Sequence, residues 1–244
     1  MRRKFLICII WGLIAANIYS QEWTHEMTEY WEPEPAKVIP GTGTNPPSDA
    51  IILFDGTSLD EWIDDDGETP KWKVEDGTVT VVPKTGSMTT RRAFGDCQLH
   101  VEFSCPPEDT GTSQQKGNSG VVMQGRYEIQ VLDNYENKTY VNGQCASVYK
   151  QYPPLVNACK PPGEWQTYDI IYTAPRFREN GILFTPGYVT IIHNGVLVQN
   201  HVEIRGRVKY IGLPEYQPHN LKEPLMLHNH TDSVKFRNIW IREL

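Results

Sequence analysis

The stretch "CQLHVEFSC" (residues 97–105) alternates apolar and polar side chains without a break. Successive side chains of a β-strand point to opposite faces, so this pattern predicts a strand with one buried face. The inward-facing residues are expected to be Cys97, Leu99, Val101, Phe103 and Cys105, and the outward-facing ones Gln98, His100, Glu102 and Ser104.

The same two-residue period recurs on both sides of this strand, interrupted by turn residues. It predicts three hairpins, which turn at Asp76-Gly77, near Gly125-Arg126 and at Asn194-Gly195. Single strands are expected in "EWQTYDIIYTA" (164–174) and "SVKFRNIWIREL" (233–244), and no long stretch has helical periodicity. The sequence therefore predicts an all-β fold of two packed antiparallel sheets, a sandwich or jelly roll.

The first twenty residues have the pattern of a signal peptide. A basic start, "MRRK", precedes the apolar run "FLICIIWGLIAA" (5–16), and Ser20 is a small residue at the expected cleavage site. This run is too short for a comfortable membrane span, and no later run is as long, so we expect no membrane-spanning segment. The pattern predicts a periplasmic or extracellular protein.

The chain has an excess of acidic residues, so we do not expect it to bind nucleic acid. Without Arg2, Arg3 and Lys4, 20 basic residues remain against 30 acidic ones, and no stripe of Lys and Arg occurs. Residues 21–48 are rich in Pro, Glu, Gly and Thr and are expected to form an extended arm before one domain at 49–244. Two long loops, 106–118 and 134–157, interrupt the strands of that domain, and loops of this length are usually functional or mobile.

Four cysteines remain after the predicted cleavage, an even number for an oxidising compartment. Cys97 and Cys105 would lie about 26 Å apart along one strand, too far to bond, and are expected to be buried free thiols. Cys145 and Cys159 flank a loop that contains prolines, and they are the expected disulfide.

The strand "YEIQVLD" (127–133) carries three polar groups, Glu128, Gln130 and Asp133. A bulge after Gln130 would turn Asp133 onto the face of Glu128, as in jelly-roll glycosidases of the β-glucanase type. Retaining glycosidases need two carboxyl groups about 5–5.5 Å apart, whereas the central Gln130 cannot ionise. Ordinary polarity of an outer face is the alternative.

Seven segments, in this order, resemble the motifs of the 3-keto-disaccharide hydrolase family, over about residues 49–244. They are "ILFDGTSLDEW", "WKVEDGTVTVV", "FGDCQLHVEFS", "GNSGVVMQGRYEIQVLD", "PPGEWQTYDI", "HNGVLVQN" and "VKFRNIWIREL". The resemblance implies a concanavalin-like jelly roll and cleavage of glycosides oxidised at C3 of the sugar. In such substrates the ketone acidifies the C2 proton, β-elimination releases the glycosidic oxygen, and hydration completes a net hydrolysis. This route needs a base, an acid and an electrophile near the C3 oxygen, but no second carboxylate.

Candidate site residues follow from the motifs and from this implied chemistry. Catalytic roles are expected for Glu128, Asp133 and His230; substrate binding for Gln130, Asn118, Glu164 and Lys150; and a divalent metal ion for His228 and His230. His193 precedes a turn and is expected to be exposed and without a role. A separate sugar 3-dehydrogenase would have to supply the keto-sugar, because the chain has no dinucleotide-binding fingerprint. A retaining glycan hydrolase and a non-catalytic carbohydrate-binding module are the alternative functions.

Overall fold

The computed structural model of the protein describes residues 22–244, so the predicted signal peptide lies outside the described residues. The chain divides after Lys37 into an N-terminal segment and a unit Val38–Leu244. The described part of the first segment is exposed throughout and contains a short 3₁₀ helix, η1 (His25–Thr28). Residues 38–48 belong to the second unit, where Ser48 N–H donates to the carbonyl of Ile39.

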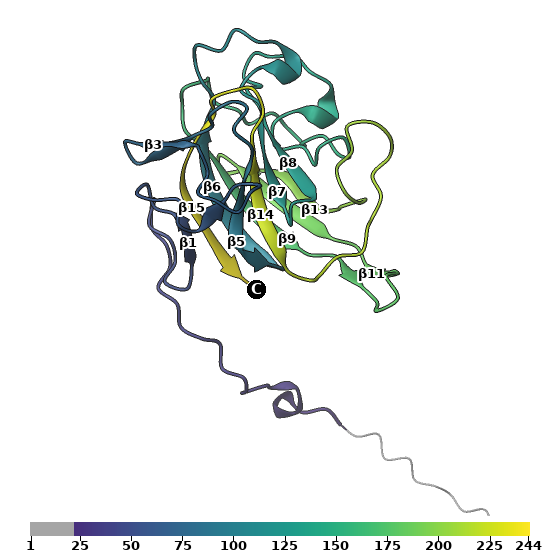
Figure 1. Ribbon diagram of the computed structural model, residues 1–244. Coiled ribbons are helices and arrows are strands. Elements are labelled where there is room, and N and C mark those ends of the chain that lie inside the picture. The colour runs from purple at the N-terminus through teal and green to yellow at the C-terminus, as the bar shows by residue number, and fades with distance from the viewer. Residues whose placement is uncertain (1–21) are drawn as a thin grey trace, which may run out of the picture. The chain divides into compact units, whose positions relative to one another are not determined.

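The larger sheet of the second unit is antiparallel and has eight strands (Figure 1). Its order is β13-β12-β9-β6-β15-β4-β3, and β1 pairs with β15 beside this path. The strands are β1 (Ile51–Phe54), β3 (Lys73–Glu75), β4 (Thr78–Thr80), β6 (Cys97–Ser104), β9 (Gln166–Thr173), β12 (Tyr188–His193), β13 (Val196–Glu203) and β15 (Lys235–Glu243).

The second sheet is also antiparallel, with the order β2-β5-β14-β7-β8. Its strands are β2 (Trp62–Ile63), β5 (Met88–Phe94), β7 (Ser119–Met123), β8 (Tyr127–Val131) and β14 (Glu223–His228). A separate pair, β10 (Arg176–Phe177) and β11 (Leu183–Thr185), and two 3₁₀ helices, η2 (Ser113–Gln115) and η3 (Val141–Gly143), complete the elements of the described residues.

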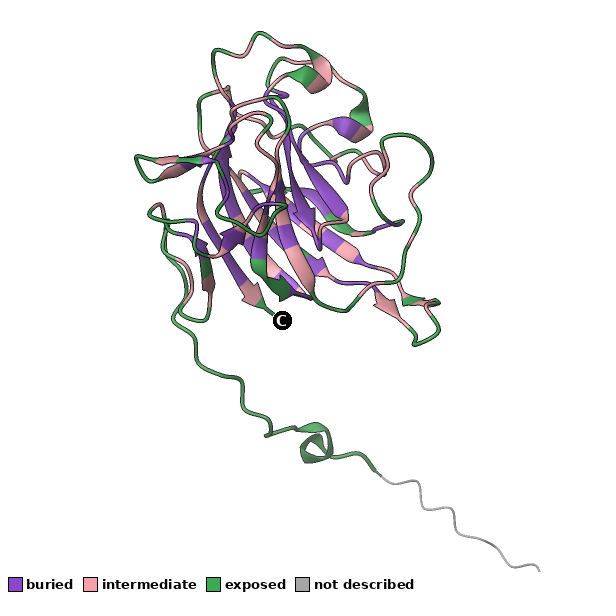
Figure 2. Cartoon of the chain, viewed as in Figure 1, coloured by how far each residue is buried: buried purple, intermediate pink, exposed green. Residues whose placement is uncertain are grey.

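The two sheets bury one hydrophobic core between them (Figure 2). The predicted inward residues of β6 and the following Cys105 are all buried. Of the predicted outward residues, Gln98 and His100 are only partly covered, but Glu102 and Ser104 are buried, which corrects that part of the prediction. Trp62, Phe103 and Phe236 are among the largest buried side chains of the core. This architecture confirms the predicted all-β sandwich of the jelly-roll, concanavalin-like class.

The predicted hairpins are present. β3 and β4 join through Asp76 and Gly77, and β12 and β13 through Asn194 and Gly195, all four residues with positive φ. Such two-residue turns match the twist of the flanking strands, and Asn, Asp and Gly tolerate the conformation they require. Within residues 22–244, no helix is long and apolar enough to cross a membrane.

Candidate functional site

Three neighbouring strands of the five-stranded sheet meet in one row of paired residues. Gly120 of β7 lies opposite His228, the last residue of β14, on one side and opposite Gln130 of β8 on the other. Glu128 precedes Gln130 by two residues and shares its face of the sheet, while Tyr127, Ile129 and Val131 pack into the core. The alternation of β8 therefore separates a polar face from the core.

The absence of a side chain at Gly120 lets Glu128 reach across β7. A Cβ atom at position 120 would lie 2.3 Å from Oε1 of Glu128, closer than any real contact. Through this gap the Glu128 carboxylate comes within 3.0 Å of Nδ1 of His228. A glycine on the central strand thus permits an ion pair between its two neighbours.

A pocket of about 280 Å³ opens over this ion pair. Its lining consists of Asn118, Glu128, Gln130, Tyr149, Val208, Tyr210, His228 and His230. Larger hollows exist, including one of about 620 Å³ beside Trp165 and Arg237, but they do not gather a carboxylate, two imidazoles and two amides. Convergent polar groups in a small concavity are typical of a site that binds and transforms a small ligand.

The two histidines of the pocket have opposite electrostatic surroundings. The hydrogen bond with Glu128 raises the pKa of His228 above its ordinary value of 6.5, and this effect outweighs burial. Burial, followed by the neighbouring His228, lowers the pKa of His230 below the same value. Their rings lie 5.6 Å apart, edge to face. The two surroundings therefore move the pKa values of the two imidazoles in opposite directions.

Two buried amides line the pocket next to Glu128. Nε2 of Gln130 donates to Oδ1 of Asn118 at 3.0 Å and to Oε1 of Gln114 at 3.2 Å, which uses both of its hydrogens. Nδ2 of Asn118 donates once, to the carbonyl of Gln114 at 2.7 Å. Because each amide nitrogen carries two hydrogens, Asn118 keeps one N–H for a ligand, and Gln130 offers its carbonyl oxygen as an acceptor.

Two tyrosines form an aromatic wall of the pocket. Tyr149 and Tyr210 line it, and the hydroxyl of Tyr149 lies 2.6 Å from that of Tyr140. The Nζ atom of Lys150 donates to the carbonyl of Tyr210 at 3.0 Å and lies over the rings of Tyr140 and Tyr210. Lys150, expected to bind substrate directly, is thus placed to hold this wall.

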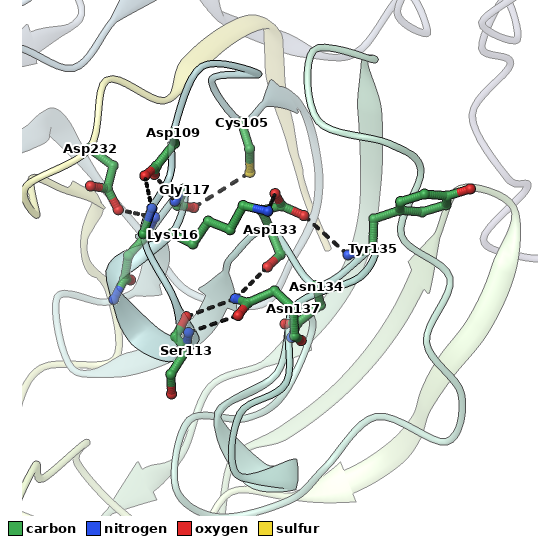
Figure 3. Close-up of polar contacts among 12 residues, drawn as sticks. Cys105, Asp109, Ser113, Lys116, Gly117, Asp133, Asn134, Tyr135, Asn137 and Asp232 are labelled. Carbon is green, nitrogen blue, oxygen red and sulfur yellow. Dashed lines mark hydrogen bonds and ion pairs between the residues drawn. The ribbon is translucent and has the colours of Figure 1, made fainter.

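Asp133 lies outside the pocket, although the sequence groups it with Glu128. β8 pairs with β7 in regular register up to Val131, and Leu132 then packs in the core beside Val131, which breaks the alternation. The carboxylate of Asp133 lies 3.1 Å from Nζ of Lys116 and accepts the N–H of Tyr135 (Figure 3). The structure therefore does not bring Glu128 and Asp133 into one hollow.

The contacts of Asp133 connect the two long loops. Its carbonyl accepts from Asn137, whose side chain also bonds both backbone groups of Ser113 (Figure 3). Asp232, in the segment between β14 and β15, accepts the N–H of Asn118 at 2.7 Å and so supports a pocket residue. These contacts place Asp133 among the groups that fix the loop in front of Asn118.

Glu164, a predicted substrate ligand, is exposed in a turn and does not line the pocket. The expectation for His193 is wrong, because this side chain is only 1% exposed. It packs against Tyr168 and Phe103, whose rings fill the space behind the Asn194-Gly195 turn.

One of the two predictions about the cysteine pairs is confirmed, and the other is wrong. Cys97 and Cys105 are buried free thiols, as predicted. Cys145 and Cys159 are also free thiols rather than the expected disulfide. The Cys145 sulfur instead contacts the hydroxyl of Tyr168 at 3.0 Å.

The divalent metal expected at His228 and His230 has no matching three-residue ligand group in the pocket. Within residues 22–244, the Cys, His and acidic side chains whose donor atoms all lie within 4.8 Å of one another are Cys145, Cys159 and His193, not the pocket residues. Nδ1 of His228 is engaged by Glu128. A metal requirement at the pocket stays a prediction, which a chelator tests.

Sequence reasoning missed the residues that loops bring to the pocket. Tyr149 precedes Lys150 on the loop 134–157, and Val208 and Tyr210 come from the irregular segment after β13. These positions follow no strand period, so the pattern of the sequence carries no signal for them. Gly120 is the last residue of the "GNSG" motif, but nothing in that motif predicts that Glu128 passes over it.

The sequence matches known proteins over nearly its whole length. The sequence model of the 3-keto-alpha-glucoside-1,2-lyase-like domain matches residues 49–242. The crystal structure of a candidate glycosyl hydrolase from Parabacteroides distasonis is 50% identical, aligns over 91% of this chain and 97% of its own, and has a TM-score of 0.87. A second candidate glycosyl hydrolase from that organism is 19% identical over 80% of this chain and 94% of its own, with a TM-score of 0.58, and shares the fold. No protein of curated function matches the sequence.

Proposed function

The chain belongs to the 3-keto-alpha-glucoside-1,2-lyase-like family, and we propose that it cleaves glycosides whose sugar is oxidised to a ketone at C3. One observation carries the proposal: a single pocket holds Glu128, His228 and His230, and the pKa values of the two imidazoles are shifted in opposite directions. Pairs of titratable groups whose pKa values are driven apart are typical of acid and base partners.

His230 is the base in this proposal. Its lowered pKa keeps the ring neutral at neutral pH, so it can accept the C2 proton of the keto-sugar. The electrons of the C2–H bond form a C1–C2 double bond, and the C1–O bond breaks. The departing oxygen takes a proton from His228, which the Glu128 carboxylate keeps charged.

Water then completes the reaction. Its hydroxyl adds to C1 and a proton returns to C2, so the net change is hydrolysis with the ketone retained. The free N–H of Asn118 is suited to the C3 oxygen, where negative charge develops during proton removal. Gln130 accepts from a sugar hydroxyl, and Tyr149 and Tyr210 offer apolar surface to the sugar or its leaving group.

The pocket favours elimination over the retaining mechanism of β-glucanases. Double displacement needs two carboxyl groups about 5–5.5 Å apart. Among the residues that line the pocket, Glu128 is the single carboxylate, and Asp133 pairs with Lys116 instead. Elimination needs no second carboxylate.

A separate oxidoreductase, a sugar 3-dehydrogenase, must supply the ketone, because cleavage by elimination involves no net oxidation. We also place the protein in the periplasm or outside the cell, on the strength of the pattern at residues 1–20.

The test compares a chromogenic 3-keto-β-glucoside with the unoxidised glucoside, each with and without a chelator. Release of the chromophore from the keto-sugar alone supports the proposal, and loss of that activity on chelation would add a metal at the pocket. Cleavage of the unoxidised glucoside would favour a conventional hydrolase, and binding of both sugars without cleavage would favour a carbohydrate-binding module.

A further inference from the structure

A second cluster of reactive side chains lies on the far side of β8 from the pocket. The sulfur atoms of Cys145 and Cys159 and a ring nitrogen of His193 all lie within 4.8 Å of one another. Cys145 is 3% exposed and His193 is 1% exposed, so bulk water has little access to either group. Thiolate and imidazole are the ligands preferred by zinc and other soft or borderline cations.

We propose that Cys145, Cys159 and His193 bind a thiophilic divalent cation such as Zn²⁺. Zinc–sulfur bonds of about 2.3 Å and zinc–nitrogen bonds of about 2.0 Å put tetrahedral ligands roughly 3.5–3.8 Å apart. The three donor atoms lie within 4.8 Å of one another, so each would have to move closer to the others by about 1 Å to bind one cation. Rotation of the side chains can supply this movement.

Three asparagines fix the backbone around the three ligands. Oδ1 of Asn134 accepts the N–H of Cys145 at 2.7 Å. Oδ1 of Asn157 accepts the N–H of Cys159 at 3.0 Å, and its Nδ2 donates to the carbonyl of Asn134. Nδ2 of Asn194, the residue after His193, donates to the carbonyl next to Cys159, that of Ala158, at 2.8 Å. The ligands are therefore held together by contacts that do not involve their own side chains.

The hydrogen bond of His193 fixes which of its ring nitrogens can bind a metal. Its Nε2 lies 3.1 Å from Oε1 of Gln166. That oxygen can only accept, which places the proton on Nε2 and leaves Nδ1 with its lone pair.

A bound cation would displace the proton of each thiol, because zinc binds thiolates. The Tyr168 hydroxyl next to Cys145 donates to the carbonyl of Gln130, so it is a neighbour of the cluster and not a fourth ligand.

A bound cation would fix one wall of the pocket. The segment after Cys145 runs beside β8: the N–H of Ala146 donates to the carbonyl of Gln130, and the N–H of Tyr149 donates to that of Glu128. A cation that joins Cys145 to Cys159 and His193 would therefore hold Tyr149 against the catalytic strand.

The test uses the chain from residue 21, the start expected after cleavage, purified first without reductant. Thiol counting after denaturation and metal analysis come first; four thiols and about one zinc per chain are expected. A Cys145–Cys159 disulfide in this material would overturn the proposal. Free thiols that bind no added zinc would overturn it as well.

Cobalt substitution then locates the metal. Co²⁺ bound to the wild-type protein is expected to show sulfur-to-cobalt charge-transfer absorption, which Cys159→Ser and His193→Gln weaken or abolish. Cys97→Ser is the matched control, a buried cysteine outside the cluster, and the double variant His228→Gln/His230→Gln tests the pocket imidazoles; both should keep the absorption. Zinc should raise the Tm of the wild-type protein but not that of Cys159→Ser. Undiminished absorption in Cys159→Ser would place the metal elsewhere and contradict the proposal.

Discussion

His228 and His230 stand two residues apart, yet their surroundings move the pKa of each ring in opposite directions. His228 gains a carboxylate partner, and its pKa rises above 6.5; His230 is buried beside another imidazole, and its pKa falls below 6.5. Between these two values the pocket holds one charged and one neutral ring. This is the state that the proposed reaction requires, with a base and an acid available together.

A bell-shaped dependence of kcat/KM on pH is the expected result. On the acid side, activity falls as His230 takes a proton, with a midpoint below 6.5; on the alkaline side, it falls as His228 loses its proton, above 6.5. Initial rates on a 3-keto-glucoside across the pH range provide the measurement. Glu128→Gln should move the alkaline midpoint down, because His228 loses the carboxylate that holds its proton. An unchanged alkaline midpoint in that variant would remove His228 from the role of acid.

Several residues of the pocket could be predicted because they lie on a regular strand or beside its end. Glu128 and Gln130 share a face by strand period, and their motif also supplied Asn118. Asp133 could not be placed by this reasoning, since β8 ends at Val131 and the contacts beyond it depend on Lys116, a loop residue. His193 was misjudged because its turn is exposed while its side chain packs inward between aromatic rings.

At the scale of the element, the spacing of β14, β7 and β8 determines whether Glu128 can reach His228. The side chain must pass over the central strand, and Gly120 leaves the room for it.

Gly120→Ala is expected to keep the fold and lose most activity. The new Cβ would meet Oε1 of Glu128, the end of a flexible side chain that can turn away, so the strand itself need not move. Turning away separates the carboxylate from His228, and kcat should fall by about 10²-fold or more, a typical contribution of a positioned acid or base. Rates and Tm are measured side by side, with Gly95→Ala, between β5 and β6, as the control, because a Cβ atom there meets its nearest neighbour only at 3.3 Å and Gly95 does not line the pocket. Full activity in Gly120→Ala would show that the ion pair is not needed.

Asp133→Asn is expected to lower stability more than chemistry. Asp133 is 2% exposed, and the variant would lose its charge toward Lys116 while an amide oxygen could still accept from Tyr135. Weakening one buried polar contact of this kind costs about 1–3 kcal/mol of unfolding free energy. Urea unfolding measures it, and kcat should stay within a few-fold of the wild-type value. A large loss of kcat with unchanged stability would return Asp133 to the catalytic groups.

The hairpins were predictable because each joins two runs of period-two alternation through turn residues that tolerate a positive φ. The hairpins at Asp76-Gly77 and Asn194-Gly195 illustrate this. The order of strands in each sheet was not predictable, since β15 pairs with β6, β4 and β1, partners that no local pattern links to it.

At the scale of the whole molecule, the sandwich carries the pocket, and the predicted export rests on the sequence pattern of residues 1–20. A bacterium that expresses the full chain is expected to deliver it to the periplasm or medium without its first twenty residues. Cell fractionation and the intact mass of the product check this. A full-length chain retained in the cytoplasm would contradict the predicted localisation.

The measurement that tests the proposed reaction most directly follows the hydrogen at C2. A 3-keto-glucoside that carries deuterium at C2 is incubated in ordinary water, and the sugar product is analysed for deuterium. The account predicts that release of the aglycone by the wild-type protein is slowed by the isotope and that the label is lost to solvent. Parallel incubations without protein and with His230→Gln, which lacks the proposed base, correct for spontaneous exchange. Rapid release of the aglycone with the deuterium still at C2 would contradict the account.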